Sequence, residues 1–388
     1  MNILFFLINM NLGGTEKSFL NLLAVLPKDV KVDLLLLERK GILLDEIPPN
    51  VNVSVIENSE VINYYLANGA RKTALWAFKK LKLSLAFKCI LQVILQKTRL
   101  INNPFWCIKN YVQKVNFEFD AAIAYAGIHN FISWFILEKV KSKKKFLWIH
   151  FDVKNVIKNK SFGLNWYGRF DKVFCVSDNA SKAFAEFFPK ISARTYIFNN
   201  VVDREELLKK SLTGNTFSNI LQDNKILTVG RLTSEKGQQM IPSIVKMLKD
   251  DLVDFKWYLI GDGNMKNNLE LKIKELQIED HLILLGAISN PYAYLRDCDL
   301  YVQTSFHEGY CITLKEALVF NRPIVTTNFI SADNIVKNNK NALIVPVSEL
   351  EIYEAVKKLI CDSTLRQKYT NYPSDSVELS DNLIELLN

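Results

Sequence analysis

Short apolar runs rich in Val, Ile, Phe and Leu alternate along this chain with segments that have an amphipathic helical period. Strands buried on both faces of a parallel sheet give such nearly continuous apolar runs, and crossover helices fall between them. In the first half, the pattern predicts strands near residues 2–8, 31–37, 51–56, 119–126, 144–150 and 171–177. The pattern then starts again and predicts strands at residues 225–230, 256–261, 281–286, 300–305, 323–327 and 342–346. We therefore expect an α/β protein with two doubly wound, Rossmann-like domains.

The length of 388 residues is enough for two domains of ordinary size. Residues 209–224 are polar and show no clear strand or helix period, which places the domain boundary there. The expected parts are a first domain (1–205), a linker (206–222), a second domain (223–370) and a C-terminal tail that could pack back on the first domain (371–388). Because ligands of such sheets bind beyond the carboxyl ends of the strands, we expect a substrate in a central cleft between the domains.

The composition, with 49% hydrophobic and 23% charged residues, is that of a folded protein and excludes a mostly disordered one. The six cysteines are scattered, with no C-x-x-C pair and no spacing typical of zinc sites, so we expect free thiols in a reducing cytosol. The apolar N-terminus has no basic leader or cleavage pattern and is interpreted as a strand. Since no uncharged apolar run reaches the roughly 18 residues that a membrane-spanning helix needs, we expect a soluble, cytoplasmic protein.

Positive charge is concentrated in the first half of the chain. The net charge is +8, but residues 1–200 carry 28 Lys and Arg against 15 Asp and Glu. This surplus fits nucleic acid, an anionic membrane or a phosphorylated substrate as a partner, and a solvated basic face is the alternative. Residues 61–117 contain ten Lys and Arg, no Asp or Glu, and interleaved Trp, Phe and Leu. This pattern is typical of a basic amphipathic helix that lies peripherally on the inner face of an anionic membrane. The alternative, that its apolar face packs on the first domain, stays equally open. No recognised nucleic-acid module accompanies the lysines, so we expect no nucleic-acid partner.

The stretch TVGRLTSEKGQQM, residues 228–240, follows an apolar strand and enters a helical pattern. Gly230 permits a tight turn, and Arg231 and Lys236 bring two cations to a helix N-terminus whose free N–H groups and dipole already favour an anion. Arg can hold two phosphate oxygens at once and Lys adds a mobile charge, so the segment predicts a diphosphate-binding loop. The alternative is an ordinary strand-to-helix turn with exposed basic side chains.

Two further motifs carry less weight. The stretch IGDGNMK, residues 260–266, begins like a dinucleotide fingerprint, but Lys266 stands at the position of the third glycine, which disfavours an NAD-dependent dehydrogenase. Asp297 and Asp299 form the D-x-D pattern that holds a divalent metal in some metal-dependent enzymes. Here Asp299 stands at the amino end of a predicted strand, whereas the site is expected at the carboxyl ends. We interpret the pair as a helix end and a strand start, and we expect no metal site.

The stretch HEGYCITLKEAL, residues 307–318, places Glu308 in the loop after a predicted strand and Glu316 within the following helix. The backbone N–H groups that open this helix would point into the expected cleft, and they belong to Tyr310, Cys311 and Ile312. A carboxylate accepts hydrogen bonds from a vicinal diol, so Glu316 is predicted to hold ribose hydroxyls and Glu308 to face the rest of the ligand. Alone, two glutamates at this spacing are common, and Glu316 could be a solvent-facing helix residue.

Taken in order, these stretches resemble the retaining family 4 glycosyltransferases, which have the two-domain GT-B fold. The resemblance covers nearly the whole sequence and rests on NLGGTEKSFLNLL, FLWIH, VGRLTSEKG, LIGDG, LGAISN, HEGYCITLKEAL and RPIVTT. It implies that the second domain binds a UDP- or GDP-sugar and that the first binds a glycan or lipid-linked acceptor. It also implies retention of anomeric configuration without a required metal or cofactor, and the synthesis of bacterial surface polysaccharide.

The resemblance also assigns roles to individual residues. Arg231 and Lys236 match a diphosphate-binding pair, Glu316 a ribose-binding glutamate, and Glu308 a glutamate near the donor sugar. Gly13 and Gly14 match a loop that closes on the diphosphate, and His150 matches a histidine that reaches the donor sugar. Ile288 matches a contact to the base, and Tyr310 to Ile312 match backbone that contacts phosphate or sugar. With Gly230, these residues form the expected donor site. The expected catalytic residues are Glu308, His150, Arg231 and Lys236. The alternative for His150 is a buried histidine at a strand end.

This sequence departs from the family pattern in two places. The family often has the sequence Glu-Gly-Phe-Gly, whereas here Tyr310 and Cys311 stand at the last two of these positions. Cys311 replaces a glycine, so it leaves less space there, which could affect the choice of donor sugar. Residues 326–345 lack the glycines that are common there. Two other functions of the same fold stay open: a nucleotide-sugar 2-epimerase, which needs no acceptor, and a non-catalytic partner that anchors another transferase at the membrane. A scaffold, however, has no need of the two cations and two glutamates described above.

Overall fold

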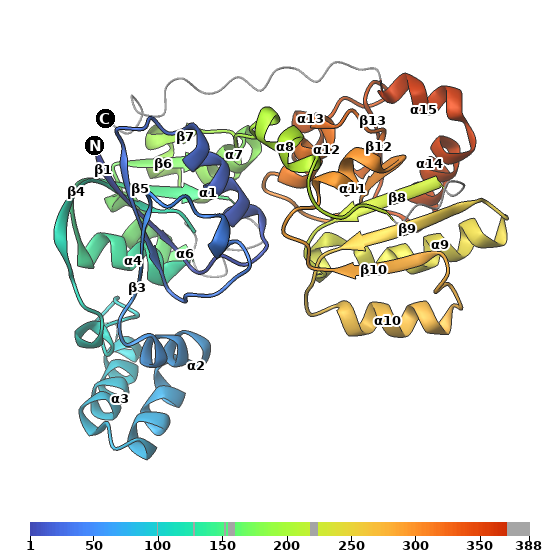
Figure 1. The fold of residues 1–388 in the computed structure, drawn as a ribbon. Coiled ribbons are helices and arrows are strands. Elements are labelled where there is room, and N and C mark those ends of the chain that lie inside the picture. The colour runs from blue at the N-terminus through green and yellow to red at the C-terminus, as the bar shows by residue number, and fades with distance from the viewer. Residues whose placement is uncertain (99, 127–128, 151–152, 154–159, 218–223, 371–388) are drawn as a thin grey trace.

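Two parallel β-sheets, one in each half of the chain, form the framework of the molecule (Figure 1). The computed structural model describes all residues except 99, 127–128, 151–152, 154–159, 218–223 and 371–388. The strand orders are β3-β2-β1-β4-β5-β6-β7 and β10-β9-β8-β11-β12-β13. In each sheet, the next two strands of the chain lie on one side of the first strand and the later strands lie on its other side. This is the doubly wound arrangement. The predicted fold class is therefore confirmed.

All the predicted strands are present, within a few residues at their ends. The first sheet consists of β1 (Asn2–Leu7), β2 (Lys31–Leu36), β3 (Asn52–Val55), β4 (Val115–Ala124), β5 (Val140–Ile149), β6 (Lys172–Cys175) and β7 (Thr195–Ile197). The second sheet consists of β8 (Asn224–Val229), β9 (Phe255–Ile260), β10 (Leu282–Gly286), β11 (Leu300–Gln303), β12 (Ile324–Thr327) and β13 (Ala342–Val345). The sequence did not predict β7, because this edge strand is short and lacks a buried apolar run.

Helices cover both faces of each sheet. The helices of the first half are α1 (Gly14–Val25), α2 (Ser59–Lys79), α3 (Leu83–Lys97), α4 (Asn130–Lys139), α6 (Lys160–Trp166), α7 (Asp178–Phe187) and α8 (Arg204–Ser211). Those of the second half are α9 (Ile241–Asp250), α10 (Lys266–Glu275), α11 (Tyr292–Asp297), α12 (Ile312–Val319), α13 (Ala332–Ile335), α14 (Glu349–Cys361) and α15 (Ser363–Thr370).

The two faces of β1 show how the first core is built. Successive side chains of a strand point to opposite faces, so Phe5 packs against Phe19 of α1 with ring centroids 5.2 Å apart. Its neighbour Phe6 packs on the other face against Phe135 of α4, with ring centroids 4.9 Å apart. The sheet therefore lies between two hydrophobic layers, and α1 is fixed on the face that leads towards the second domain.

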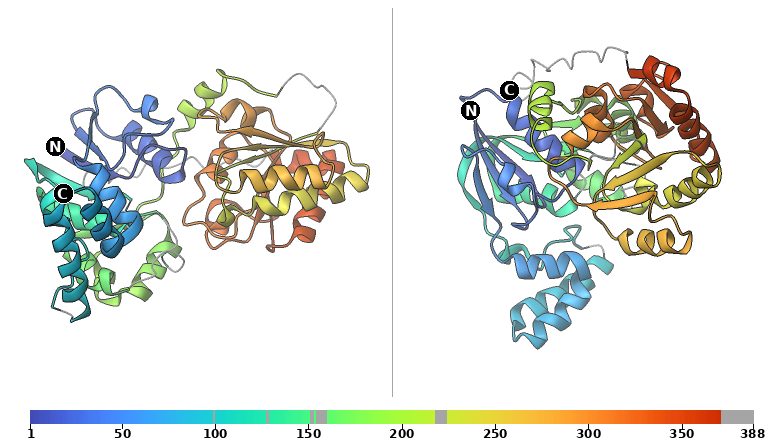
Figure 2. Two further views of the ribbon diagram at one scale, coloured as in Figure 1. Left: turned by 90° about the horizontal axis from the view of Figure 1, so that it is seen from below. Right: turned by 45° about the vertical axis from the view of Figure 1, so that its right-hand side comes forward.

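Helices α2 and α3 form a hairpin that projects from the first domain (Figures 1 and 2). One side of this hairpin is buried, for example at Ala77, Leu85 and Cys89. The other side exposes large apolar side chains, namely Leu75, Phe78, Leu81, Leu83, Phe87, Ile90, Ile94 and, just beyond it, Leu100. The packing alternative thus accounts for the buried side of the hairpin but not for these exposed apolar side chains. Among the described residues, no helix has the length and apolar character needed to span a bilayer.

The expected linker, residues 206–222, begins inside α8. This helix starts with Asp203, whose side chain accepts a hydrogen bond from the backbone N–H of Glu206 and so caps the helix. Leu207 of α8 is buried in a hydrophobic cluster of the second half. Residues 218–222 of the linker, the next residue and the expected tail, 371–388, lie outside the described residues.

Candidate active site

The turn after β8 holds the predicted diphosphate loop against its neighbours. Gly237, with φ +69°, follows Lys236, and a Cβ there would lie 2.0 Å from the carbonyl oxygen of Thr304. The Thr304 hydroxyl also donates to the carbonyl of Lys236 at 2.9 Å. Only glycine permits this approach and this backbone conformation. The loop that carries Lys236 is therefore fixed to the end of β11.

Gly261 of the GDG stretch allows the turn after β9 to pack closely against the same loop. Gly261 has φ +153°, and a Cβ there would lie 1.9 Å from the carbonyl oxygen of Gly230. The backbone N–H of Gly230 donates to Ile260 O at 2.9 Å, and that of Leu232 donates to Asp262 O at 3.0 Å. The two turns therefore lie backbone against backbone, which explains the partial fingerprint as a packing feature of the loop that contains Arg231.

Lys236 and Glu308 form a close ion pair, with Nζ 2.6 Å from Oε1. Their side chains are only 17% and 9% exposed. Burial disfavours the ammonium form of Lys236, but the charge and hydrogen bond of Glu308, together with Cys311, outweigh it, so that the pKa of Lys236 lies above its usual value. One cation and one glutamate of the predicted site are thus in direct contact.

A chain of hydrogen bonds along β11 positions Glu308. Tyr301, Gln303 and Ser305 point to the same side because they alternate along the strand and its extension. The Tyr301 hydroxyl donates to Gln303 Oε1 at 2.7 Å, and Gln303 Nε2 donates to Ser305 Oγ at 2.7 Å. Ser305 in turn donates to Glu308 Oε1 at 2.7 Å. These supports were not predicted, although polar residues at alternate positions of a buried strand are a readable signal.

Glu316 of α12 is completely buried, with a side-chain exposure of 0%. Lys17 of α1 donates to both of its oxygens, at 3.2 Å to Oε1 and 3.1 Å to Oε2. The hydroxyl of Tyr292 donates to Oε1 at 3.0 Å, and the Lys17 ammonium lies 5.1 Å from the centre of the Tyr292 ring. Burial first, and then the Glu316 charge, raise the pKa of Tyr292 well above its usual range. Glu316 is therefore not a solvent-facing helix residue; it lies where the two domains meet.

Arg231 is half exposed and makes a loose ion pair, with Nη2 3.7 Å from Glu235 Oε1. Its charge also acts on Glu16, in the first turn of α1 of the other domain. Burial raises the pKa of Glu16 to about 7, although its own backbone N–H and the charge of Arg231 act in the opposite direction. Glu16 and Lys17 were not predicted as site residues, although both stand in the stretch NLGGTEK.

The loop before α12 touches the first domain. Ser177 Oγ, at the N-cap of α7, donates to the carbonyl of Gly309 at 3.1 Å, and Tyr310 packs against the hydrophobic cluster on the α1 face of the first sheet. Cys311 is the N-cap of α12, and Ile312 is its first residue. Burial raises the pKa of the Cys311 thiol to about 12, so this thiol is protonated near neutral pH. Cys311 is therefore a small, neutral and buried side chain at the start of α12.

His150 follows β5 and is buried. Neither ring nitrogen has a hydrogen-bond partner among the described residues, and burial lowers the pKa of His150 to about 3. Its ring lies 4.4 Å from that of Tyr125, whose hydroxyl bonds to Ser18 at 2.9 Å. His150 is therefore a neutral imidazole that is connected through Tyr125 to the residue next to Lys17.

The predicted loop glycines and the base contact lie at the margins of this arrangement. Gly13 is the N-cap of α1 and Gly14 its first residue. No described atom lies within 4 Å of a Cβ placed on Gly14, so there is open space beside this helix N-terminus. Ile288 lies in the segment after β10 and packs against the cluster that contains Tyr292. Gly13 and Gly14 thus open the helix whose Lys17 contacts Glu316, and the role of Ile288 stays a prediction.

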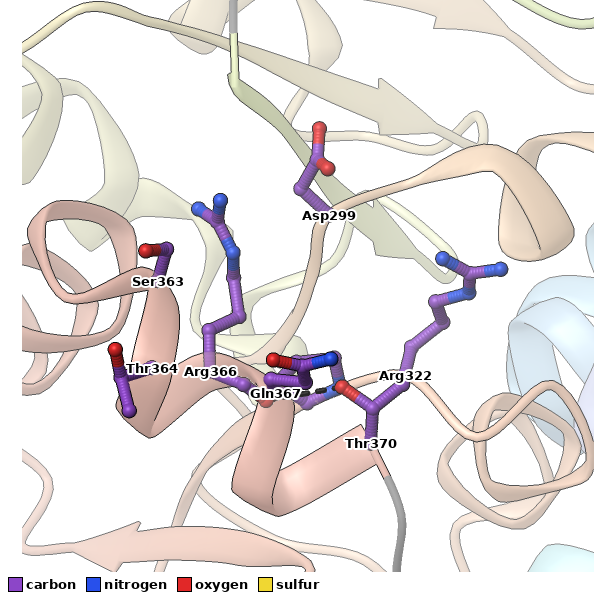
Figure 3. A pocket seen from close by; sticks show the side chains of 8 residues that line it. Asp299, Arg322, Ser363, Thr364, Arg366, Gln367 and Thr370 are labelled. Carbon is purple, nitrogen blue, oxygen red and sulfur yellow. Dashed lines mark hydrogen bonds between the residues drawn. The ribbon is translucent and has the colours of Figure 1, made fainter.

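The D-x-D carboxylates lie elsewhere. Asp297 accepts a hydrogen bond from Thr216 at 2.8 Å, and Asp299 accepts one from the backbone N–H of Lys225 at 2.9 Å. Asp299 and Arg322 line a cavity of about 330 Å³ at the amino ends of β11 and β12 (Figure 3). This cavity lies at the amino ends of the strands, whereas Glu308 lies beyond their carboxyl ends. In the part of the chain that the structure describes, no group of three or more His, Cys, Asp or Glu is placed to hold a metal.

The second half of the chain matches a known family. Residues 216–374 match the family model described as "Glycosyl transferases group 1". A 177-residue stretch is 32% identical to N-acetylgalactosamine-N,N'-diacetylbacillosaminyl-diphospho-undecaprenol 4-alpha-N-acetylgalactosaminyltransferase of Campylobacter jejuni, covering 45% of this chain and 47% of that protein. A 154-residue stretch is 26% identical to the capsular polysaccharide biosynthesis glycosyltransferase CapM of Staphylococcus aureus, covering 39% of this chain and 40% of that protein. The chain thus spans about half, or less, of the length of these relatives.

Solved structures resemble the whole chain. The Anabaena protein Alr3699/HepE, solved in complex with UDP, superposes with a TM-score of 0.65 at 17% identity, over 96% of this chain and 93% of that one. S. aureus TarM, solved as a point mutant in complex with fondaparinux, alpha-GlcNAc-glycerol and UDP, superposes with a TM-score of 0.65 at 13% identity, over 100% and 99%. At these identities the likeness shows the fold alone, and the chain has the GT-B fold.

Proposed function

We propose that this protein is a retaining, metal-independent glycosyltransferase that moves a sugar from a nucleotide-sugar donor to a glycan or lipid-linked acceptor. One observation carries the proposal. Two glutamates of a single loop and helix, Glu308 and Glu316, are each bound by a lysine at the carboxyl end of the second sheet, where ligands of doubly wound sheets bind. The match of the second half to group 1 glycosyl transferases supports the same assignment.

In this proposal, cationic side chains stabilise the negative charge of the leaving group. Negative charge develops on the departing diphosphate, and Arg231 and Lys236 would stabilise it. Arg231 is half exposed and its ion pair with Glu235 is long, so its guanidinium is available to two phosphate oxygens. Lys236 would contact the ligand while it keeps Glu308 as its partner, which leaves Glu308 held near the donor sugar. The N–H groups at the start of α12 would add neutral donors.

The donor is proposed to be a UDP- or GDP-sugar. Glu316 would bind the ribose hydroxyls, Ile288 would contact the base, and the loop at Gly13 and Gly14 would close on the diphosphate. His150 is neutral near pH 7 because its pKa is about 3, so its imidazole could donate one hydrogen bond to a sugar hydroxyl without bringing a charge. Cys311 occupies the space beside the proposed sugar position and would limit which sugars fit.

For the chemical step we propose transfer on the face of the leaving group. The acceptor hydroxyl approaches the anomeric carbon from the side of the departing diphosphate, and a phosphate oxygen takes its proton. The new glycosidic bond forms as the bond to the phosphate oxygen breaks, so anomeric configuration is retained. The residues described above would bind and neutralise charge, and none of them has to act as a nucleophile.

The acceptor is proposed to be a membrane-borne glycan in the synthesis of a bacterial surface polysaccharide. The α2–α3 hairpin supports this proposal because it exposes apolar and basic side chains together, as a surface for anionic lipid requires. Its exposed basic residues include Arg71, Lys72, Lys79 and Lys80. In the proposed arrangement the protein is cytoplasmic and attaches peripherally at the inner face of the membrane through residues 61–117.

The decisive experiment offers purified protein a panel of UDP- and GDP-sugars, with and without a polyprenyl-diphosphate-linked glycan. We expect a glycosylated lipid of retained configuration, detected by mass spectrometry and NMR, in buffer that contains a chelator of divalent cations. An epimerised sugar nucleotide formed without an acceptor would show the 2-epimerase instead. The absence of any nucleotide-dependent product, together with no thermal shift from any nucleotide, would favour a non-catalytic partner.

A further inference from the structure

The carboxylate of Glu316 is largely occupied by protein in this structure. A carboxylate offers about four acceptor positions on its two oxygens, and Lys17 and Tyr292 donate three hydrogen bonds to them. The side chain is 0% exposed. A ribose diol, which needs two of these positions, therefore has no path to Glu316 while Lys17 stays in place.

The two donors to Glu316 have different origins. Tyr292 belongs to α11 of the second domain and moves with Glu316, whereas Lys17 belongs to α1 of the first domain. Lys17 is itself 8% exposed, so the pair is removed from water on both sides. One neighbouring contact crosses the same interface: Lys315 of α12 donates to the carbonyl of Asn200 of the first domain at 3.3 Å. Within the first domain, Ser18 of α1 donates to the Asn200 side chain at 2.6 Å. The Lys17–Glu316 contact thus exists only when the domains are together.

We propose that Lys17 competes with the donor's ribose for Glu316, so that the donor-free protein closes on its own nucleotide site. Lys17 must release at least one Glu316 oxygen before the ribose binds, which separates α1 from α12 during donor entry. Because coupling between two equilibria is reciprocal, a bound nucleotide weakens the domain contact by the same factor by which the contact weakens nucleotide binding. This inference rests on the proposed role of Glu316 and adds a regulatory role for a residue of the acceptor domain.

The test compares UDP binding, measured by calorimetry with GDP in parallel, in the wild type and in Lys17→Met. Methionine keeps most of the length of the side chain but removes the ammonium. We expect UDP affinity to rise about fivefold or more and the radius of gyration of the nucleotide-free protein, measured by small-angle X-ray scattering, to increase. Lys17→Arg is the matched control: it keeps the charge and should stay near the wild type. Lys17→Gln provides the same comparison if Lys17→Met does not fold.

A Glu316→Gln variant separates the possible failures. If Glu316→Gln weakens UDP binding but Lys17→Met leaves it unchanged or weakens it, Lys17 does not compete with the ribose and the inference is wrong, while the proposed site stands. If Glu316→Gln has no effect on the binding of either nucleotide, the ribose assignment is wrong and both ideas fall.

Discussion

Lys236 Nζ and Glu308 Oε1, from residues 72 positions apart in the chain, lie 2.6 Å from each other. The pair joins the loop after β8 to the loop after β11 and is mostly shielded from water. Neither residue alone would be favourable here, because a buried charge without a partner is costly. The pair is therefore part of the fold as well as of the proposed site.

Removal of Lys236 alone should destabilise the protein. Lys236→Met leaves the Glu308 carboxylate buried without its cation, and we expect the free energy of unfolding to fall by about 3 kcal/mol in urea titrations. The double variant Lys236→Met, Glu308→Gln leaves no unpaired charge and should recover part of this loss. Simple additivity of the two single effects would contradict the pairing.

Arg231→Ala should separate activity from stability. Its side chain is half exposed and its ion pair with Glu235 spans 3.7 Å, so we expect unfolding free energy to change by no more than about 0.5 kcal/mol. Turnover should fall about 100-fold, because a preorganised charge at the leaving group is lost. Lys246→Ala, which removes a lysine from an exposed i,i+4 ion pair of the same domain, is the control and should leave turnover unchanged. Equal turnover in both variants would exclude Arg231 from the site.

Glu16 should make stability depend on pH. Burial raises its pKa from 4.5 to about 7 in the folded protein, so the folded state holds the proton more tightly than the unfolded state does. The stability contributed by this proton is complete below pH 4.5 and is lost as the pH rises through about 7, by at most about 3 kcal/mol. Urea titrations between about pH 5 and pH 8 should show this loss, and Glu16→Gln should flatten it.

The control for Glu16 is Glu60→Gln, which changes an exposed glutamate in the first turn of α2. Its profile should follow that of the wild type. If Glu16→Gln also follows the wild-type profile, the Glu16 carboxylate does not carry the proton.

The exposed face of the α2–α3 hairpin should bind anionic vesicles. Phe78, Leu81 and Phe87 are 66%, 84% and 66% exposed, and their replacement by serine should reduce co-sedimentation with vesicles of phosphatidylcholine and phosphatidylglycerol several-fold. Leu252→Ser removes a side chain of comparable exposure from the second domain and should have no effect. Equal partition of the wild type to neutral and anionic vesicles would count against the membrane proposal.

The strands were predictable because burial on both faces leaves little choice of residue type along a central strand. The edge strand β7 was not, because a strand at the end of a sheet can be polar. The Lys236–Glu308 pair was anticipated as two members of one site, although the sequence could not show that they touch. Lys17 escaped notice because its partner, Glu316, is 299 positions away. Burial of a charge depends on which elements meet, and no local pattern records that.

The separation of Lys17 from Glu316 also has a consequence for biosynthesis. Ribosomes add about 5 to 20 residues per second, so the 299 intervening positions take about 15 to 60 s to make. During this time α1 can already be packed on its sheet while its lysine, without a counter-ion from the unfinished second domain, remains in water. The Lys17–Glu316 contact of the domain interface therefore cannot form until the second domain has been made at least as far as α12.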